Sequence, residues 1–441
     1  MVCLIRFLVN PMLTVLLEKL ISPKAYFMPE DKIRELRHKA IIEAHKYHYG
    51  NNNYYREYCE SKGIGLSITP SDFPKLLIPD SVFKSYPMDF PEQDIPAFAK
   101  WLQYISSVSI PQDLPSSTGT LEEMLNEFYK RDILLGFSSG TSGRMTFLPR
   151  DKQTRENLVK SYVSTVDAHV KLDKGNTYFV LSIPEESYLQ IAWNGKNVSN
   201  ALSPGKAYFA MKHLKADFIR IRTGKLKNFK ERVIKGLSNL LAPRIQKKAE
   251  ELTIKYLRQL KDKKLVFLAP PYMIASVARK IIERGIDVKL HPESIITSTG
   301  GFKGRTPIEQ EEMYRLIKEA FGLDKHRYPD LYGMTESNSI AMECLEGLHK
   351  HFPPWIEPIL LDENMEPIEP DGKVTGQYGF LEPSILSYPG FILTGDRLTV
   401  NWDGCDACNR NTPIIEKIER MPTVEGRGCS GVLARTVGAQ I

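Results

Sequence analysis

Cysteine is scarce in this chain, with six among 441 residues: Cys3, Cys59, Cys344, Cys405, Cys408 and Cys429. So few cysteines in so long a chain exclude the disulfide framework that holds small secreted domains together. The composition, 42% hydrophobic and 25% charged, is typical of a globular protein. We therefore expect a reducing compartment, the cytoplasm.

Long uninterrupted apolar runs are also missing. Residues 1–21 are largely apolar, but Arg6, Pro11, Glu18 and Lys19 interrupt the run. These interruptions exclude a transmembrane segment, and no small-residue cleavage site follows. The segment predicts an amphipathic helix that docks either on the protein core or on a membrane surface.

Strong charge of one sign is confined to one region. The net charge is only +6, yet residues 206–264 carry 18 Lys/Arg against 5 Asp/Glu, a net of +13. The region lacks interleaved aromatics and any nucleic-acid-binding module, so we expect no nucleic-acid partner. It predicts a solvated helical face, or a surface that attracts nucleotide phosphates or an acidic partner protein.

The order of predicted elements indicates an α/β fold. Expected helices at 29–49 and 121–129 come first. After them, strands expected at 177–183, 265–270 and 294–297 alternate with helices expected at 244–262, 273–284 and 309–321. This alternation favours a largely parallel sheet. Past Pro353 the pattern changes to short β-like runs with Gly and Pro.

A Ser/Gly-rich loop follows the apolar residues 134–137. Its glycines can turn backbone N–H groups toward an anion, and its hydroxyls add further donors. The spacing is not that of a Walker A loop. The pattern indicates a phosphate cradle, although ordinary turns share this composition. The residues concerned are Ser138, Ser139, Gly140, Thr141, Ser142 and Gly143.

Three later segments carry nucleotide-binding residue types. Gly300 and Gly301 follow a predicted strand and let the backbone approach a base or a phosphate. In the segment 332–337, Thr335 suits a phosphoryl oxygen and Glu336 suits Mg²⁺. Asp396, in Leu-Thr-Gly-Asp, suits ribose hydroxyls. For each segment taken alone, an ordinary turn or surface residue is the simpler interpretation.

Taken in order, these segments resemble the adenylate-forming superfamily of acyl-CoA ligases, adenylation domains and luciferases. The resemblance implies an α/β fold with a large mixed-sheet N-terminal domain (1–393, with a helical segment 1–60) and a short C-terminal subdomain (394–441). It implies ATP and Mg²⁺ as cofactors, with Glu336 as metal ligand. The implied nucleotide contacts are residues 138–143, Gly300, Gly301, Tyr332, Gly333, Met334, Thr335, Glu336, Asp396 and Arg410.

More loosely, most of the chain resembles acyl-protein synthetases of bacterial bioluminescence and the phenylacetate-CoA ligase-like group. The similarity lies in residues 53–56, 78–84 and 300–304 and in the short C-terminus. Such synthetases move the acyl group from acyl-AMP to their own cysteine and then to a reductase. The matching position is Cys429, where Arg427 favours the nucleophilic thiolate. The alternative is that Cys429 is a cysteine without a catalytic role in a C-terminal tail.

Other candidate residues remain open. Lys303 could contact phosphate or be a solvated turn lysine; the superfamily's usual lysine lies in a larger C-terminal domain that we expect this chain to lack. Arg410 and Arg420 follow Asp396 at distances where the superfamily places nucleotide-contacting or hinge arginines. Trp193 could line the acyl pocket or belong to the core.

The pair Cys405 and Cys408 forms a C-x-x-C. It could be half of a zinc site, with Cys429 as a third ligand, but a structural turn is the simpler interpretation. The histidines, His291, His326, His349 and His351, show no metal-ligand spacing in the sequence.

The sequence therefore predicts an AMP-forming ligase that activates a carboxylic acid, of a fatty kind by the resemblance, and transfers the acyl group to a thiol. Three acceptors stay open: Cys429, which then passes the acyl group to a reductase; coenzyme A; or a carrier protein. The remaining alternative is a non-catalytic scaffold.

Overall fold

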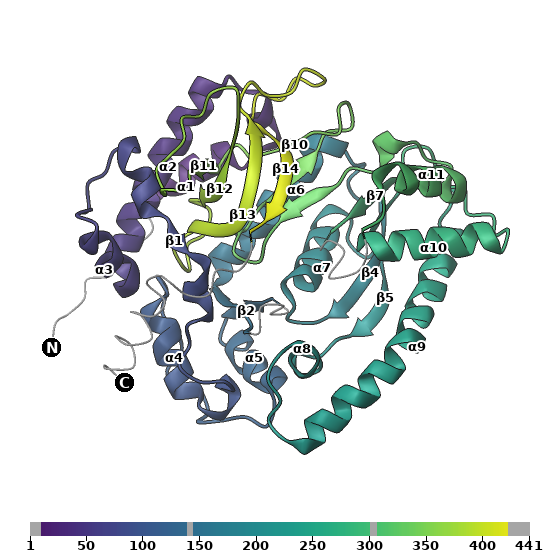
Figure 1. Cartoon of the computed structure of the whole chain (residues 1–441), viewed down its shortest axis with the longest axis horizontal. Coiled ribbons are helices and arrows are strands. Elements are labelled where there is room, and N and C mark those ends of the chain that lie inside the picture. Colours follow the sequence, from purple (N-terminus) through teal and green to yellow (C-terminus); the bar gives the residue numbers. More distant parts are fainter. Residues whose placement is uncertain (1–9, 139–143, 300–306, 422–441) are drawn as a thin grey trace.

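The structure is a computed structural model that describes residues 10–138, 144–299 and 307–421. Within these ranges the chain forms an eight-stranded sheet, a four-stranded sheet and a two-stranded hairpin, with helices around them (Figure 1). The prediction of an α/β fold with mixed sheet is confirmed. The expectation of largely parallel pairing holds for the four-stranded sheet, whereas the eight-stranded sheet is mainly antiparallel.

The four-stranded parallel sheet has the order β5-β4-β6-β7. Its strands are apolar on both faces because helices cover both. Phe179 and Leu181 pack against α6 and α7, while Val180 and Phe267 pack against α9, α10 and α11. The elements are β4 (Tyr178–Glu186), β5 (Ala207–His213), β6 (Leu265–Ala269), β7 (Ile295–Ser298), α6 (Lys152–Val170), α7 (Gln190–Leu202), α9 (Phe229–Gln259), α10 (Pro271–Glu283) and α11 (Gln310–Phe321).

The eight-stranded sheet has the order β11-β12-β13-β14-β10-β9-β8, and the short β1 pairs in parallel with β13. The domain boundary expected after residue 393 falls inside β13, which pairs on both sides along its length. The strands are β1 (Ile78–Pro79), β8 (Leu331–Gly333), β9 (Ile340–Glu343), β10 (Lys350–His351), β11 (Glu357–Leu361), β12 (Lys373–Leu381), β13 (Phe391–Asn401) and β14 (Ile414–Arg420).

Helices near the N-terminus pack against this sheet. The helix α1 (Pro11–Leu20) buries Leu13, Leu16, Leu17 and Leu20 in the largest apolar core, so it docks on the protein itself. The neighbouring helices are α2 (Glu30–Asn51) and α3 (Asn53–Ser61). None of the helices in the described ranges combines the length and the apolar character needed to cross a bilayer.

The remaining elements of the described ranges are a hairpin, three helices and short 3₁₀ turns. The hairpin of β2 and β3 lies between α5 and α6 along the chain, and α8 precedes α9. Short 3₁₀ turns occur at 23–27, 70–76, 80–84, 91–93 and 325–327. The elements are α4 (Ile95–Tyr104), α5 (Leu121–Tyr129), β2 (Leu134–Phe137), β3 (Phe147–Arg150) and α8 (Ala216–Thr223).

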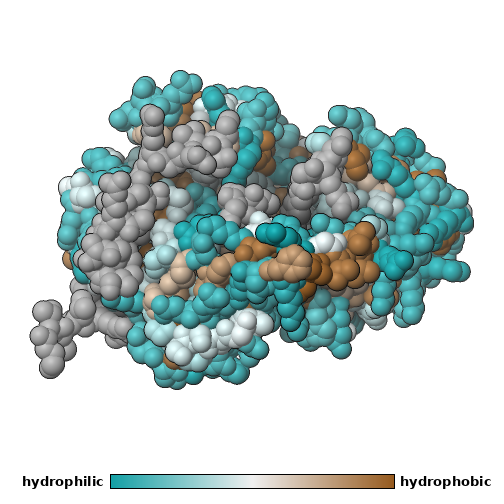
Figure 2. Space-filling view, turned by 60° about the horizontal axis from the view of Figure 1, so that its bottom comes forward, coloured by the Kyte–Doolittle hydropathy of each residue, from teal (hydrophilic) through white to brown (hydrophobic). Residues whose placement is uncertain are grey.

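The helix α9 begins fifteen residues before the start expected from the sequence at Arg244. The expectation was wrong because Pro243, a residue that usually ends a helix, lies inside this one. The first half of α9 leaves large apolar side chains exposed. Figure 2, which turns the lower side of Figure 1 toward the viewer, shows an apolar band on the side where α9 lies.

Candidate functional site

Asp396, at the middle of β13, is held between two side chains. It lies opposite Arg420 in the β13–β14 register, and its Oδ1 atom is 2.8 Å from Arg420 Nη1. Its Oδ2 atom accepts a hydrogen bond of 2.8 Å from the Tyr332 hydroxyl. Burial, together with the Asp396 charge, raises the pKa of Tyr332, so this hydroxyl stays protonated and donates. The structure thus joins two separately predicted motifs, Tyr332 and Asp396, in one place.

The segment 78–84 reaches the same place through strand pairing. Ile78 and Pro79 pair in parallel with Ile392 and Leu393 at the start of β13, which brings the following 3₁₀ turn alongside that strand. The turn carries Asp80 and Lys84, whose side chains are 3.3 Å apart. The sequence analysis used this segment only as part of the resemblance to acyl-protein synthetases, and the structure gives it a position in the site.

Glu336 is a buried carboxylate between these elements. Its pKa is raised by burial, and the Lys84 charge opposes the rise while the Asp80 charge adds to it. A buried carboxylate in this environment gains from a nearby cation, because a cation stabilises its ionised form. Carboxylate oxygen is also a ligand that Mg²⁺ prefers, so Glu336 fits the metal role predicted for it.

Arg150 fixes the loop that carries Thr335 and Glu336. The fully buried guanidinium donates to the Thr335 carbonyl oxygen at 2.7 Å and to Asn338 Oδ1 at 3.0 Å. It also donates to Gln190 Oε1 at 2.8 Å, at the start of α7. A buried charge of this kind is stable when its donors are satisfied. Arg150 therefore ties the hairpin, α7 and the predicted nucleotide loop together.

Glu382 holds the other side of the same loop. Its fully buried carboxylate accepts hydrogen bonds from the Ser337 hydroxyl at 2.7 Å and from the Asn338 backbone N–H at 3.1 Å. The hydroxyls of Ser339 and Ser384 donate to its second oxygen. The loop after Glu336 is therefore fixed by two buried charges of opposite sign.

An apolar cavity of about 280 Å³ opens beside these residues. Ser138, Thr299 and Thr335 line it together with Gln190 and Asn194. The cavity follows α7 from Gln190 to Leu202, which at 1.5 Å per residue is ~18 Å. Its apolar lining lies between α6, α7 and the parallel sheet and includes Val166, Val170, Leu181, Val198, Leu202 and Ile295.

The Ser/Gly loop connects the two strands of the β2–β3 hairpin. Ser138 lines the cavity, and its backbone N–H donates to the Thr146 carbonyl at 3.4 Å. At the other end of the loop, Arg144 donates to the carbonyl oxygens of Tyr86 and Met88 at 2.6 and 2.7 Å. Ser138 therefore places the first end of the predicted phosphate cradle at the cavity, and Arg144 anchors the residue after its other end to the segment 86–88.

Several predicted residues lie outside the described ranges. They are Ser139, Gly140, Thr141, Ser142, Gly143, Gly300, Gly301, Lys303 and Cys429. Their predicted roles stay predictions. Among the described ones, Gly333, Met334 and Thr335 line the cavity.

Arg410 does not join Asp396. Its guanidinium is 3.1 Å from Glu346 Oε2 and donates to the Ala168 carbonyl at 2.8 Å. The structure thus places Arg420, and not Arg410, against the carboxylate predicted to bind ribose. Trp193 does not line the apolar cavity but a different pocket, with Tyr188 and His213.

Arg150, Glu382 and Gln190 were missed by the sequence analysis. Each makes contacts over a long sequence separation, such as the 185 residues between Arg150 and Thr335, so no local spacing reveals them. A weak signal exists for Glu382, because it is a lone charge that directly follows the apolar end of a buried strand.

Comparison with known proteins gives matches over most of the chain. The family described as "Acyl-protein synthetase, LuxE" matches residues 244–438. A long-chain-fatty-acid–luciferin-component ligase of Aliivibrio fischeri is 22% identical over 95% of this chain and 93% of its own. The Vibrio harveyi protein of the same name is 23% identical over 93% of this chain and 89% of its own.

Among solved structures, an open conformation of 2-hydroxyisobutyryl-CoA ligase, in complex with 2-HIB-AMP and CoA, has a TM-score of 0.59. It is 14% identical and covers 89% of this chain and 75% of its own, so the likeness concerns the fold. The predicted resemblance to adenylate-forming enzymes and acyl-protein synthetases is confirmed by these matches.

Proposed function

We propose that this chain, which has the fold of the adenylate-forming enzymes and is similar to acyl-protein synthetases, is an AMP-forming ligase for a long-chain fatty acid. In the first step the carboxylate oxygen attacks the α-phosphorus of ATP. The acyl–phosphate bond forms, the bond to pyrophosphate breaks, and pyrophosphate leaves. In the second step a thiolate attacks the acyl carbonyl, and AMP leaves with the electron pair of the broken bond.

The observation that carries this proposal is the elongated apolar cavity that opens beside Thr335 and Ser138. A narrow cavity lined by aliphatic side chains over ~18 Å suits an alkyl chain, with hydrophobic burial as the source of affinity. The polar groups at its mouth then meet the carboxylate of the acid. In this proposal the reacting carboxylate lies next to the predicted nucleotide loop.

The chain's own residues position the nucleotide and neutralise charge. Asp396, with two acceptor oxygens, binds the ribose hydroxyls, and Arg420 and Tyr332 fix its orientation. Arg150 and Glu382 hold the Thr335–Glu336 loop rigid, so that little reorganisation is needed as charge develops. The Ser138 end of the hairpin loop contributes to the phosphate cradle.

Mg²⁺ fits this site through Glu336, whose buried carboxylate would hold it. When bound, the ion supplies charge neutralisation for the phosphate oxygens. Lys84 lies on the same side and supplies a further positive charge near the carboxylate.

We assign the thiol of the second step to Cys429. The support is its position in the resemblance and the neighbouring Arg427, a cation that lowers a thiol pKa. An acyl reductase or a carrier protein then receives the acyl group, whereas coenzyme A is the acceptor if Cys429 plays no part.

Intact mass spectrometry distinguishes these acceptors. The wild-type chain, incubated with ATP, Mg²⁺ and tetradecanoic acid, gains the mass of one acyl group, and Cys429→Ser forms acyl-AMP without this gain. Cys59→Ser, at a buried thiol in α3, is the matched control and keeps the gain. If the wild type carries no acyl group and AMP release requires coenzyme A, the assignment of Cys429 is wrong.

A further inference from the structure

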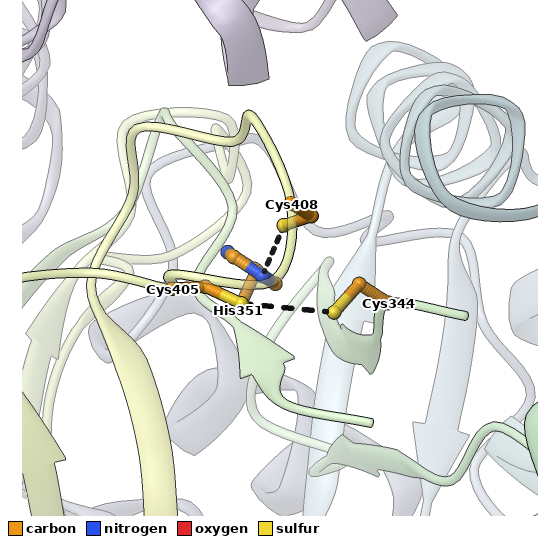
Figure 3. Close-up of side chains that lie close together, drawn as sticks. All are labelled: Cys344, His351, Cys405 and Cys408. Atoms are coloured by element: carbon orange, nitrogen blue, oxygen red, sulfur yellow. Dashed lines mark hydrogen bonds between the residues drawn. The ribbon is translucent and has the colours of Figure 1, made fainter. Parts of the chain in front are cut away.

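A cluster of three cysteines and one histidine lies on loops of the eight-stranded sheet. Cys344 follows β9, His351 ends β10, and Cys405 and Cys408 belong to the turn between β13 and β14. Figure 3 shows the four side chains pointing toward one another. One ligand atom from each lies within 4.8 Å of all the others. The sequence favoured a structural turn for the C-x-x-C over half of a zinc site, and the structure brings Cys344 and His351 beside it.

Two of the separations between ligand atoms are close to those of tetrahedral coordination. The Sγ atoms of Cys344 and Cys405 are 3.9 Å apart, and Cys408 Sγ is 3.3 Å from His351 Nε2. Zinc–sulfur bonds of about 2.3 Å and zinc–nitrogen bonds of about 2.0 Å place tetrahedral ligand atoms roughly 3.5–3.8 Å apart. The cysteines of the cluster are free thiols rather than a disulfide.

Neighbouring groups orient these ligands. His351 Nδ1 lies 3.3 Å from Thr412 Oγ1, a distance at which Nδ1 can donate and leave the Nε2 lone pair toward the cysteines. The Gly347 N–H donates to Cys344 Sγ at 3.4 Å. Arg410 lies beside Cys408 and brings a positive charge. Three thiolates with one divalent cation leave a net negative charge, which Arg410 offsets.

The two turns that carry the cysteines also pack closely against each other. An added Cβ at Gly347 would lie 2.6 Å from Ala407 Cβ, so the turn after β9 and the C-x-x-C turn interlock. Direct strand pairing nearby is short, since β10 meets β14 at two residue pairs. A bound ion would join these turns where the sheet provides little pairing.

We propose that Cys344, His351, Cys405 and Cys408 bind one structural zinc ion. Three sulfur ligands and one imidazole are a donor set typical of zinc, and four protein ligands leave no open position for catalysis. The ion braces the turn that leads into β14, the strand that carries Arg420 to Asp396. The four ligands complete the site without Cys429, which leaves that thiol available for acyl transfer.

Metal analysis of the purified full-length chain tests the zinc site and is independent of any acid activity. We expect about one zinc ion per wild-type chain and per Cys59→Ser control, and less than about a fifth of that in the double variant Cys405→Ser/Cys408→Ser. Cobalt substitution of the wild type should give thiolate-to-cobalt absorption bands, and this readout holds even if the double variant does not fold. A wild type without zinc and without these bands, or one that holds iron instead, would overturn the proposal.

A second feature stands on separate evidence, the exposed apolar stripe of α9 (Figure 2). Apart from one adjacent pair, its members recur every three or four residues, so they share one face of the helix. Phe229 and Leu240 are 74% and 75% exposed. The stripe consists of Phe229, Val233, Leu237, Leu240, Leu241 and Ile245.

The charges beside this stripe are almost all positive. Within residues 229–248 the exposed charged side chains are basic: Lys230, Arg232, Arg244, Lys247 and Lys248. The single acidic residue of this stretch, Glu231, is buried and paired with Arg220. A helix with a large exposed apolar face and a basic rim is the pattern of an interfacial membrane helix.

We propose that the first half of α9 binds an anionic lipid surface. Flotation with phosphatidylcholine vesicles containing a quarter phosphatidylglycerol should carry the wild-type chain, and binding should weaken at high salt. The variant Leu237→Glu/Leu240→Glu should bind at least about tenfold less, whereas Leu66→Glu and Met365→Glu, at exposed apolar positions elsewhere, should bind like the wild type. Absence of vesicle binding by the wild type, equal binding by the α9 variant, or binding to an acidic protein but not to vesicles would overturn the proposal.

Discussion

Asp396 and Arg420 face each other across β13 and β14, and Arg420 Nη1 lies 2.8 Å from Asp396 Oδ1. The arginine side chain is 69% exposed, whereas the carboxylate is buried. The pair therefore presents a fixed acceptor at the edge of the site while its counter-ion remains in contact with solvent.

Replacement of Asp396 tests its role toward ATP. Hydrogen bonds to a charged group contribute about 1.5–3 kcal/mol, so Asp396→Ala should raise the KM for ATP roughly 10- to 100-fold in a pyrophosphate-release assay. Glu419→Gln, a neighbour of Arg420 on β14, is the matched control and should leave this KM unchanged. An unchanged KM in Asp396→Ala would remove the carboxylate from the nucleotide site.

Gly136 should be intolerant of any side chain. An added Cβ would lie 2.0 Å from Gln190 Oε1 and 2.8 Å from Arg150 Nη1, inside the network that holds the Thr335 loop. Gly136→Ala should lower the free energy of unfolding by about 1–3 kcal/mol, as overpacking does, and should lower activity with it. The measurement is denaturant unfolding followed by circular dichroism.

The control for this prediction lies in α9. A Cβ at Gly236 meets no atom within 4 Å, so Gly236→Ala should raise stability by roughly 0.5–1 kcal/mol through helix propensity. Equal stability of the two variants would mean that the Arg150–Gln190 network does not constrain Gly136.

The depth of the apolar cavity should set the length of the acid. Leu202 lines the cavity at the far end of α7 from Gln190. A tryptophan there fills the space of the chain terminus, so Leu202→Trp should lower kcat/KM for tetradecanoate at least about tenfold and spare octanoate. Asn200→Trp, at an exposed position of the same helix, should behave like the wild type. Equal losses for both acids would mean that the alkyl chain lies elsewhere.

Glu357 should make stability depend on pH in the acid range. Burial raises the pKa of this carboxyl, but Arg37 and His38 outweigh burial and lower the pKa from 4.5 to about 2. The folded state therefore gains stability that is fully present above pH 4.5 and is lost as the pH falls toward 2. The loss amounts to roughly 3 kcal/mol.

Thermal unfolding between pH 4.5 and pH 2 measures this contribution. Glu357→Gln should be less stable than the wild type at pH 6 and should lose part of the pH dependence in that window. Glu369→Gln, at an exposed carboxylate in the loop after β11, should retain the wild-type profile. The same slope in all three chains would show that the pair of Arg37 and Glu357 does not stabilise the fold.

Much of the parallel sheet could be predicted because its strands are continuous apolar runs. The strand expected at 265–270 is β6 (Leu265–Ala269), and the helix expected at 309–321 is α11 (Gln310–Phe321). That Tyr332 and Asp396 belong to one site could also be predicted, because both residues are part of recognisable motifs. Local composition carries such signals.

Contacts between distant segments could not be predicted in this way. Cys344 and Cys405 are 61 residues apart and meet because β9, β10 and the β13–β14 turn converge in the sheet. Arg150 likewise contacts the Thr335 loop only because the β2–β3 hairpin packs beside that loop. These residues become visible as parts of a site when the strand order is known.

Acid-dependent exchange of labelled pyrophosphate into ATP tests the central claim most directly, because it reports acyl-AMP formation whatever the later acceptor is. The wild-type chain should catalyse this exchange with tetradecanoate, and Asp396→Ala should do so at least about tenfold more slowly at low ATP. If no acid from a panel of fatty, aryl and amino acids supports exchange, the chain is not an AMP-forming ligase.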